Sequence, residues 1–418
     1  MIVLVSDLHL ADTPLRSTIN VPWFLRNIRR LVYQAREDGI KSLKIVLLGD
    51  IFEVLKSKEW LDQKVRPWEK STSKHRATVA SIFESIISSN SDFIEGIKSI
   101  ITDYPFVSLH YIPGNHDLPL NTEMGDTARR RLQSILPLQI SNGEKFGEYL
   151  VDPVHGVIAR HGHEWDSTNR YVNGLAAIGD AVVIDLLLRF PIVVADKLGI
   201  SEDDERLNFL HELDNVRPQS SPVMAKWLLA GLDRMSEDGS ETGRRAIEEA
   251  CYDIAKGLLE VKDSAKFESI EELAWWINFL TKLAPMILKY LGTLTTASHI
   301  ALGGKEGAGP YREYAINDFQ ITDATGGEYR YVICGHTHNP LIAPLDIADS
   351  ENRWARLYLN TGTWRRVYRY ADITAGKKNT ATFAHWDEEC LISIYSPEEQ
   401  ARGLPAYEFN RLTRGVRV

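Results

Sequence analysis

Residues 43–53 read LKIVLLGDIFE, in which a run that is apolar except at Lys44 leads into Gly49 and Asp50. A short run that is apolar at every position, rather than at alternate ones, is typical of a strand covered on both faces of its sheet. The glycine allows the backbone to turn sharply where the strand ends. We therefore expect residues 43–48 to form a buried strand that presents the Asp50 carboxylate at its end. We interpret Glu53 as a group that supports a metal ligand rather than as a ligand itself.

Four further apolar runs lead into residues that can bind metals. Asp7 and His9 follow residues 2–5, Asn115, His116 and Asp117 follow residues 107–112, His161 and His163 follow residues 157–159, and His336 and His338 follow residues 329–334. Carboxylate, amide and imidazole groups form a ligand set suited to divalent ions. Folding can bring these five motifs together around two ions, although they are spread from residue 7 to residue 338.

The pattern of the chain predicts a catalytic domain with an insertion. Helical patterns at residues 18–36, 75–101 and 126–136 alternate with the first strands, which indicates an α/β fold. The first of these has Ser17 or Thr18 as a possible N-cap. From residue 169 to residue 309 the strand pattern disappears, so we predict that 169–309 is an all-helical insertion into a domain made of 1–168 and 310–418. Residues 303–310, rich in glycine, are typical of a flexible connection.

Composition narrows the class of protein. The 418 residues are 44% hydrophobic and 25% charged, as in globular enzymes, and the net charge of -9 disfavours nucleic acid as a partner without excluding it. Three scattered cysteines indicate a reducing, cytoplasmic setting. The chain opens with a strand pattern instead of a leader, and charged residues and prolines interrupt its most apolar stretches, so we expect no transmembrane segment.

The five motifs together resemble the calcineurin-like metallophosphoesterase superfamily, over about residues 1–168 and 310–395. The resemblance implies the calcineurin-like phosphoesterase fold, a four-layer β-sandwich flanked by helices. It also implies one metal held by Asp7, His9, Asp50 and His338, and a second held by Asp50, Asn115, His161 and His336. Asp50 would bridge the two ions. His163 is the alternative to His161, and we interpret it as a neighbour of the ligands.

The residues left over from metal binding suggest the catalytic groups. Adjacent residues cannot all face one ion, so we assign Asn115 to a metal, His116 to the substrate and Asp117 to orienting His116. Two divalent ions, with manganese expected and iron or zinc as alternatives, would activate water to hydroxide. The expected activity is hydrolysis of a phosphodiester, phosphomonoester or pyrophosphate bond. The alternatives are a metal-dependent nuclease acting on DNA or RNA, and a non-catalytic binding scaffold on the same fold.

The substrate class stays open among a phosphorylated small molecule, a nucleotide and a lipid-linked compound. Residues 5–10 and 49–53 are similar to the UDP-2,3-diacylglucosamine pyrophosphatase branch, which commonly has arginine in place of His116 and no insertion of this length. We predict that the insertion is a lid near the metals. Its apolar stretches 186–188 and 274–280 indicate either a helical core or a groove for an acyl chain or partner. Arg129, Arg130 and Arg131, and likewise Arg365, Arg366 and Arg369, either bind extra phosphate charge or form surface ion pairs.

Overall fold

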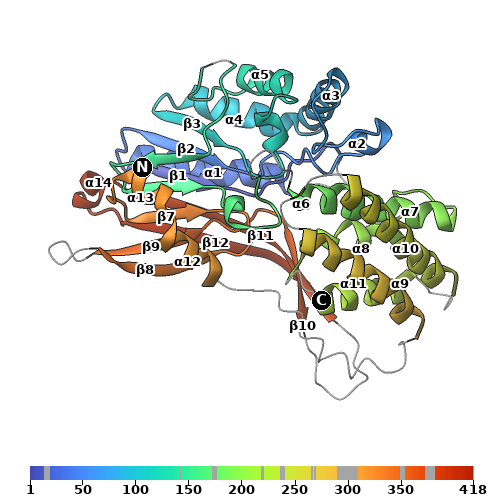
Figure 1. Cartoon of the computed structure of the whole chain (residues 1–418). Coiled ribbons are helices and arrows are strands. Elements are labelled where there is room, and N and C mark those ends of the chain that lie inside the picture. The colour runs from blue at the N-terminus through green and yellow to red at the C-terminus, as the bar shows by residue number, and fades with distance from the viewer. Residues whose placement is uncertain are drawn as a thin grey trace.

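The computed structural model describes residues 1–13, 19–141, 143–171, 177–217, 221–235, 241–264, 267, 270–289, 309–348, 354–371 and 382–417. These residues form an α/β protein with two mixed β-sheets and many helices (Figure 1). Within these ranges no helix combines the length and the apolar character that a membrane span requires. The two mixed sheets and their helices confirm the α/β class expected from the strand and helix patterns.

The larger sheet has the strand order β3-β2-β1-β11-β10-β6, with β12 paired to β11. Its strands are β1 (Ile2–Val5), β2 (Leu43–Leu48), β3 (Val107–Ile112), β6 (Val216–Arg217), β10 (Arg366–Ala371), β11 (Thr382–Ile394) and β12 (Tyr407–Arg417). β1, β2 and β3 are parallel, whereas β11 runs antiparallel to β1. The loops that follow the three parallel strands therefore leave the same edge of the sheet, and they carry Asp7, Asp50 and Asn115.

The smaller sheet has the order β4-β5-β7-β9-β8. Its strands are β4 (Tyr149–Asp152), β5 (Val157–Arg160), β7 (Tyr331–Cys334), β8 (Leu341–Ala348) and β9 (Trp354–Asn360). β5, β7 and β9 are parallel neighbours. Their carboxyl ends place His161, His336 with His338, and Thr361 in adjacent loops. The parallel strands of both sheets, apart from β9, thus lead into residues that the sequence motifs mark as candidates for chemistry.

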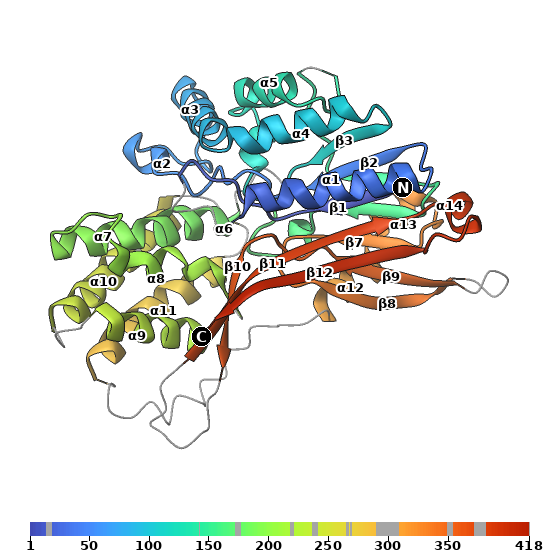
Figure 2. The ribbon, with the colours of Figure 1, turned by 180° about the vertical axis from the view of Figure 1, so that it is seen from behind.

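The two sheets pack face to face, with helices on both outer faces (Figures 1 and 2). Ile2 and Leu4 of β1 point into the core between the sheets, toward residues such as Ile333 of β7, while Val3 and Val5 point to the outer helices. The outer helices on this side are α1 (Val21–Glu37), α3 (Ser73–Ser89), α4 (Ser91–Asp103) and α5 (Asp126–Ile135), and those on the smaller sheet are α12 (Gly309–Asn317) and α13 (Phe319–Thr325). The alternation of side chains along β1 explains why its run is apolar throughout.

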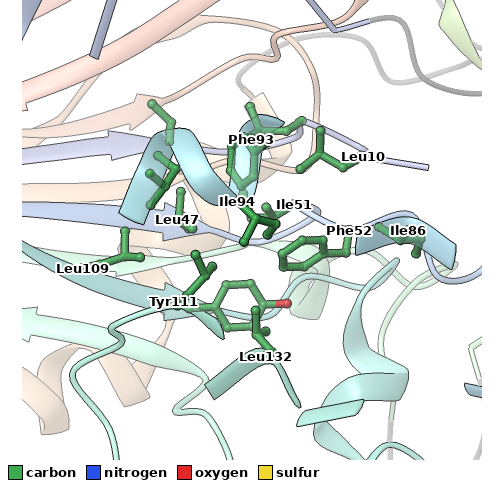
Figure 3. Close-up of a cluster of buried hydrophobic side chains, with 14 of the residues drawn as sticks. Leu10, Leu47, Ile51, Phe52, Ile86, Phe93, Ile94, Leu109, Tyr111 and Leu132 are labelled. Atoms are coloured by element: carbon green, nitrogen blue, oxygen red, sulfur yellow. The ribbon is translucent and has the colours of Figure 1, made fainter. Parts of the chain in front are cut away.

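The outer core also anchors the loops at the strand ends. Leu10 follows His9, and Ile51 and Phe52 follow Asp50; all three side chains are fully buried. Figure 3 shows them among apolar side chains of α3 and α4, including Ile86 and Phe93. Burial of one such side chain is worth about 1.5–3 kcal/mol. The polar residues of these loops are therefore fixed by the apolar residues beside them.

The described residues between 178 and 289, called the helical segment below, are mostly helical and pack around an apolar cluster of their own. Its helices are α6 (Ile178–Ala181), the π-helix η4 (Val182–Leu188), α7 (Arg189–Leu198), α8 (Asn208–His211), α9 (Ser221–Met235), α10 (Glu241–Ser264) and α11 (Ile270–Lys289), with short 3-10 turns η5 (Glu205–Leu207) and η6 (Leu213–Asn215). They pack around a cluster that includes Leu186, Phe190 and Ile254. Leu273 and Leu280 are buried, whereas Trp275, Trp276 and Phe279 are half-buried and contact one another.

The prediction that residues 169–309 are all helical is wrong at one point. Val216 and Arg217 form the strand β6, which pairs with β10 of the larger sheet. A strand of two residues is too short to produce a periodic pattern, and its partner lies more than 140 residues further along the chain, so the sequence around it carries no sign of the pairing. The helical segment is thus tied to the sheet by backbone hydrogen bonds as well as by apolar contacts.

The strand predictions within the two sheets are confirmed at β1, β2, β3, β5 and β7. The single helix predicted over residues 75–101 is wrong, because the chain breaks into α3 and α4 at Asn90. The side-chain amide of Asn90 donates hydrogen bonds to the carbonyl oxygens of Ala11 and Ile86, both at 2.8 Å. Helix α1 is capped by Asn20, whose side chain accepts from the Trp23 amide. The predicted caps Ser17 and Thr18, and residues 303–308 of the glycine-rich connection, lie outside the described residues.

Candidate metal centre

Five of the seven proposed ligands share an uncommon backbone conformation. Asp7, His9, Asp50, His336 and His338 have φ between 48° and 69°, in the left-handed region that side chains other than glycine rarely adopt. Lys64 is the sixth non-glycine residue with positive φ in the described part of the chain. This backbone conformation costs roughly 1–3 kcal/mol per residue, and it persists only where the surrounding structure enforces it, which is common at functional sites. The strain is concentrated at the residues that the motifs singled out.

Backbone hydrogen bonds extend the pairing of β1 and β2 into the loops beyond them. The amides of Asp7, His9 and Leu10 donate to the carbonyl oxygens of Gly49, Asp50 and Ile51, at 2.9–3.0 Å. The carboxylate of Asp7 accepts from the His336 amide at 3.0 Å, and its carbonyl oxygen accepts from the Thr363 hydroxyl at 2.8 Å. The ligand loops of the two sheets are therefore joined directly.

One group of potential ligands consists of Asp7, His9 and His338, whose ligand atoms lie within 4.8 Å of one another. The Nε2 atom of His338 is 3.2 Å from both Oδ1 of Asp7 and Nε2 of His9. Asp50 Oδ2 is 3.8 Å from the same nitrogen of His9. All four side chains are buried. These are the four residues that the resemblance assigns to one ion.

The second group consists of Asp50, His161 and His336, again within 4.8 Å. Oδ2 of Asp50 is 3.1 Å from Nε2 of His161. The side-chain amide of Asn115 donates to Asn169 Oδ1 at 3.3 Å, and the amide of Asn169 donates to Asp166, the partner of His336. The backbone amide of the next residue, His116, donates to Asp50 Oδ1 at 2.8 Å. Asp50 therefore stands between the two groups. A third combination, His9 with Asp50 and His116, is also close enough to hold an ion.

Hydrogen bonds at the second ring nitrogen orient three of these histidines. Nδ1 of His9 lies 2.7 Å from Glu53 Oε2, Nδ1 of His161 lies 2.9 Å from the Leu48 carbonyl oxygen, and Nε2 of His336 lies 2.9 Å from Asp166 Oδ2. An acceptor at one nitrogen places the proton there and leaves the lone pair of the other nitrogen for a cation. His338 differs from these three histidines, because its Nδ1 faces a hydrogen-bond donor, the guanidinium group of Arg217, instead of an acceptor.

Among the residues that the structure describes, several buried ligand atoms make no contact with the geometry of a hydrogen bond. They include Oδ1 of Asp7, Oδ1 of Asn115 and Nε2 of His161. An isolated buried polar atom is costly, and in folded proteins nearly all of them are paired. Two bound cations would satisfy these atoms together. The unpaired atoms, the carboxylate, amide and imidazole chemistry and the convergence on Asp50 all fit a pair of divalent ions.

His116 is oriented by Glu53, so the prediction that Asp117 orients it is wrong. Nδ1 of His116 is 2.7 Å from Oε1 of Glu53, whose other oxygen contacts His9. Both oxygens of Asp117 instead accept from backbone amides, of Gly114 at 2.5 Å and of Ile51 at 2.9 Å. Asp117 thus fastens the loop after β3 to the loop after β2. The interpretation of Glu53 as a supporting group agrees with these contacts.

The pKa values reflect burial set against close opposite charges. Burial opposes the charged form of His116, but the carboxylates of Glu53 and Asp50 outweigh it and raise the pKa to about 9. Burial likewise opposes the charged form of His161, and Asp50 raises its pKa to about 10. Burial lowers the pKa of His338 to about 3. Because a cation must displace the proton of His161, metal affinity is expected to fall as the pH falls.

His163 lies beside the ligands rather than among the grouped atoms. Its ring centroid is 5.5 Å from that of His161, and burial lowers its pKa to about 4.

The sequence motifs missed three residues whose side chains form hydrogen bonds with the proposed ligands. Asp166 contacts His336, Asn169 contacts the Asn115 side chain, and Arg217 contacts His338. None of them follows a strand with an apolar run, so no local pattern marks them.

The arginine clusters have separate surroundings. Arg130 and Arg131 form surface ion pairs with Asp126 and Glu84, which agrees with the surface-ion-pair alternative. Arg129 is buried against Asp126 and backbone carbonyls. Of the second cluster, Arg365 is buried on Asp214 at 3.1 Å, Arg366 pairs with Asp387 at 3.1 Å, and Arg369 reaches Asn339 at 3.2 Å. Of the second cluster, Arg369 therefore reaches the loop that carries His338, whereas Arg366 pairs with Asp387.

Gly114 is required by the close approach of the loops after β2 and β3. A Cβ atom at this position would lie 2.2 Å from Oδ1 of Asp50 and 2.6 Å from its backbone nitrogen. We expect Gly114→Ala to move the Asp50 carboxylate and weaken manganese affinity roughly 10- to 100-fold, as loss of an orienting contact does. Isothermal titration measures the affinity.

The matched control is Gly147→Ala, because the nearest atom to a Cβ there is 3.5 Å away, an ordinary contact. Thermal unfolding of both variants separates a local effect from loss of the fold. Unchanged manganese affinity in folded Gly114→Ala would contradict the placement of Asp50 at the centre.

No protein-family model matches the sequence, and a search of curated proteins also finds no match. The resemblance to calcineurin-like metallophosphoesterases therefore rests on the five sequence motifs.

Proposed function

We propose that this chain is a metal-dependent phosphoric ester hydrolase that binds two divalent ions, bridged by Asp50, on a calcineurin-like phosphoesterase fold. The observation that carries the proposal is that Asp50 is grouped with His161 and His336 and also lies 3.8 Å from His9 of the other group. Among the described residues, buried ligand atoms of Asp7, Asn115 and His161 also lack a hydrogen bond. The packing of helices on both outer faces of two sheets supports the fold assignment.

Asp7, His9, Asp50 and His338 would hold one ion, and Asp50, Asn115, His161 and His336 the other. Bound there, two divalent ions supply the activation of water and the charge neutralisation that phosphoester hydrolysis needs. Mixed nitrogen and oxygen ligands accept manganese, our expected ion, as well as iron or zinc. Glu53 and Asp166 would keep the imidazoles of His9 and His336 in the tautomers that leave a lone pair toward the ions.

His116 would act as the acid in the reaction. Its Nδ1 is held by Glu53, so its Nε2 is the atom that can meet the substrate, and its side chain is 16% exposed beside fully buried neighbours. With a pKa raised above neutrality by Glu53 and Asp50 against the effect of burial, the imidazolium carries a proton at pH 7. As the water oxygen bonds to phosphorus and the ester bond breaks, Nε2 of His116 donates its proton to the departing oxygen.

A panel of four substrates tests the function. We expect the manganese-loaded protein to hydrolyse at least one of an aryl phosphomonoester, an aryl phosphodiester, a nucleotide-sugar pyrophosphate and single-stranded DNA. Turnover only on DNA would favour the nuclease alternative. Two bound metals without turnover on any of the four would favour a non-catalytic scaffold. Failure to bind manganese would contradict the metal centre itself.

A further inference from the structure

Strand β6 places two arginines side by side. In the parallel pairing of β6 with β10, Arg217 stands opposite Arg369, as Val216 does opposite Tyr368. In-register residues of neighbouring strands project from the same face of a sheet. Like charges in this arrangement repel each other. Two guanidinium groups held side by side at this edge of the sheet therefore favour an anion nearby.

Both arginines reach the loop that carries His338. Nη2 of Arg217 lies 2.9 Å from Nδ1 of His338, and Nη2 of Arg369 donates to Oδ1 of Asn339 at 3.2 Å. Neither arginine forms an ion pair with a carboxylate within the ranges that the structure describes. Asp214 is near, but its carboxylate is shared by Lys56 at 3.0 Å and Arg365 at 3.1 Å. Within the described residues, the two guanidinium groups therefore stand without a carboxylate partner of their own beside one of the proposed metal positions.

The contact of Arg217 with His338 is compatible with only one tautomer of the imidazole. A guanidinium can only donate, so Nδ1 of His338 accepts in this arrangement. An imidazole that gives its Nε2 lone pair to a cation carries its proton on Nδ1, where it can no longer accept. With a cation bound, Nη2 of Arg217 must turn to another acceptor. Both arginines are partly exposed, so an acceptor from solution can reach them.

We propose that Arg217 and Arg369 form a subsite for a second phosphoryl group of the substrate, on the His338 side of the metal pair. This inference rests on the proposed function and narrows the substrate to compounds with two linked phosphoryl groups. Guanidinium groups bind phosphate oxygens in paired, charge-assisted hydrogen bonds, which suits them to this role. Arg217 belongs to the helical segment, so the segment supplies part of the specificity.

Isothermal titration of the manganese-loaded protein with three probes tests the subsite. Methylphosphonate carries one phosphoryl-like group, methylenediphosphonate carries two, and phosphonoacetate replaces the second by a carboxylate. We expect methylenediphosphonate to bind at least about tenfold more tightly than the other two, since one charged hydrogen bond is worth about a factor of ten or more. Excess manganese throughout compensates for chelation by the probe.

Arg217→Gln and Arg369→Gln are each expected to weaken methylenediphosphonate binding roughly 10- to 100-fold and to leave methylphosphonate binding unchanged. Arg366→Gln is the matched control, because Arg366 lies on the same strand, alternates to the other face from Arg369 and pairs with Asp387. Thermal unfolding of each variant checks the fold, and Arg369 provides a second test if the Arg217 variant is unstable.

Two outcomes overturn the subsite while leaving the proposed function intact. One is equal affinity of the wild-type protein for methylphosphonate and methylenediphosphonate. The other is that both arginine variants lose affinity for the two probes to the same extent, which would place the arginines at the scissile phosphate. Tighter binding of phosphonoacetate than of methylenediphosphonate would overturn the phosphoryl assignment. Failure to bind manganese would overturn the proposed function and the subsite together.

Discussion

Replacing Asp50 with asparagine is expected to reduce turnover on the order of 10³-fold, because metal-based charge stabilisation is worth several kcal/mol and each factor of ten corresponds to about 1.4 kcal/mol. Asp50 belongs to the group with His161 and His336 and lies 3.8 Å from His9 of the other group. Asparagine tolerates the left-handed backbone that Asp50 adopts at φ 52°, so the variant removes charge with little change in the loop. Metal analysis should show fewer than two manganese ions per chain.

The control is Asp103→Asn, at a carboxylate that is 54% exposed and pairs loosely with Arg29. It should retain both ions and wild-type turnover. A folded Asp50→Asn protein with two ions and undiminished turnover would contradict a bridging role for Asp50. Loss of one ion with turnover preserved would instead limit catalysis to a single metal.

Replacing His116 with alanine is expected to keep both metals and to lower turnover about 10²- to 10⁴-fold, the usual contribution of a positioned acid. The loss should be larger for an alkyl phosphoester than for a p-nitrophenyl ester, whose leaving group needs less help from a proton. Unchanged turnover on an aryl phosphodiester would refute the assignment. His110→Ala, at a half-buried histidine of β3, serves as the control.

The pH profile gives an independent reading of His116. The acid form is present below its pKa, which Glu53 and Asp50 raise to about 9 against the effect of burial, and is lost as the pH rises through that value. Bound cations lower the pKa, so the alkaline limb of kcat/KM should fall somewhat below pH 9. The limb should disappear in His116→Ala. In Glu53→Gln it should move to lower pH, since the carboxylate that raises the pKa is gone.

Much of the centre could be predicted because its ligands follow a local rule. Asp7, Asp50 and Asn115 come directly after strands that are parallel in one sheet, and His161 and His336 after strands that are parallel in the other. Apolar runs reveal the strands, and parallel strands bring their carboxyl ends to one edge. The partner of His116 could not be assigned in this way. Glu53 and Asp117 both lie in loops that follow parallel strands of the larger sheet, and only the geometry of these loops shows which carboxylate contacts His116.

The sequence by itself determined which side chains are candidates for the chemistry and where most core strands lie, because both depend on residue type and on spacing within a few residues. Tertiary structure alone decided the contacts made by Glu53, Asp166 and Arg217, and the pairing of β6 with β10. Those contacts join segments that are distant in the chain, and their free energy depends on the distance and burial of both partners. No local sequence pattern encodes such a distance. The hydrogen bonds that Glu53 and Asp166 form with the proposed ligands, and the position of Arg217 beside His338, are therefore visible only in the folded chain.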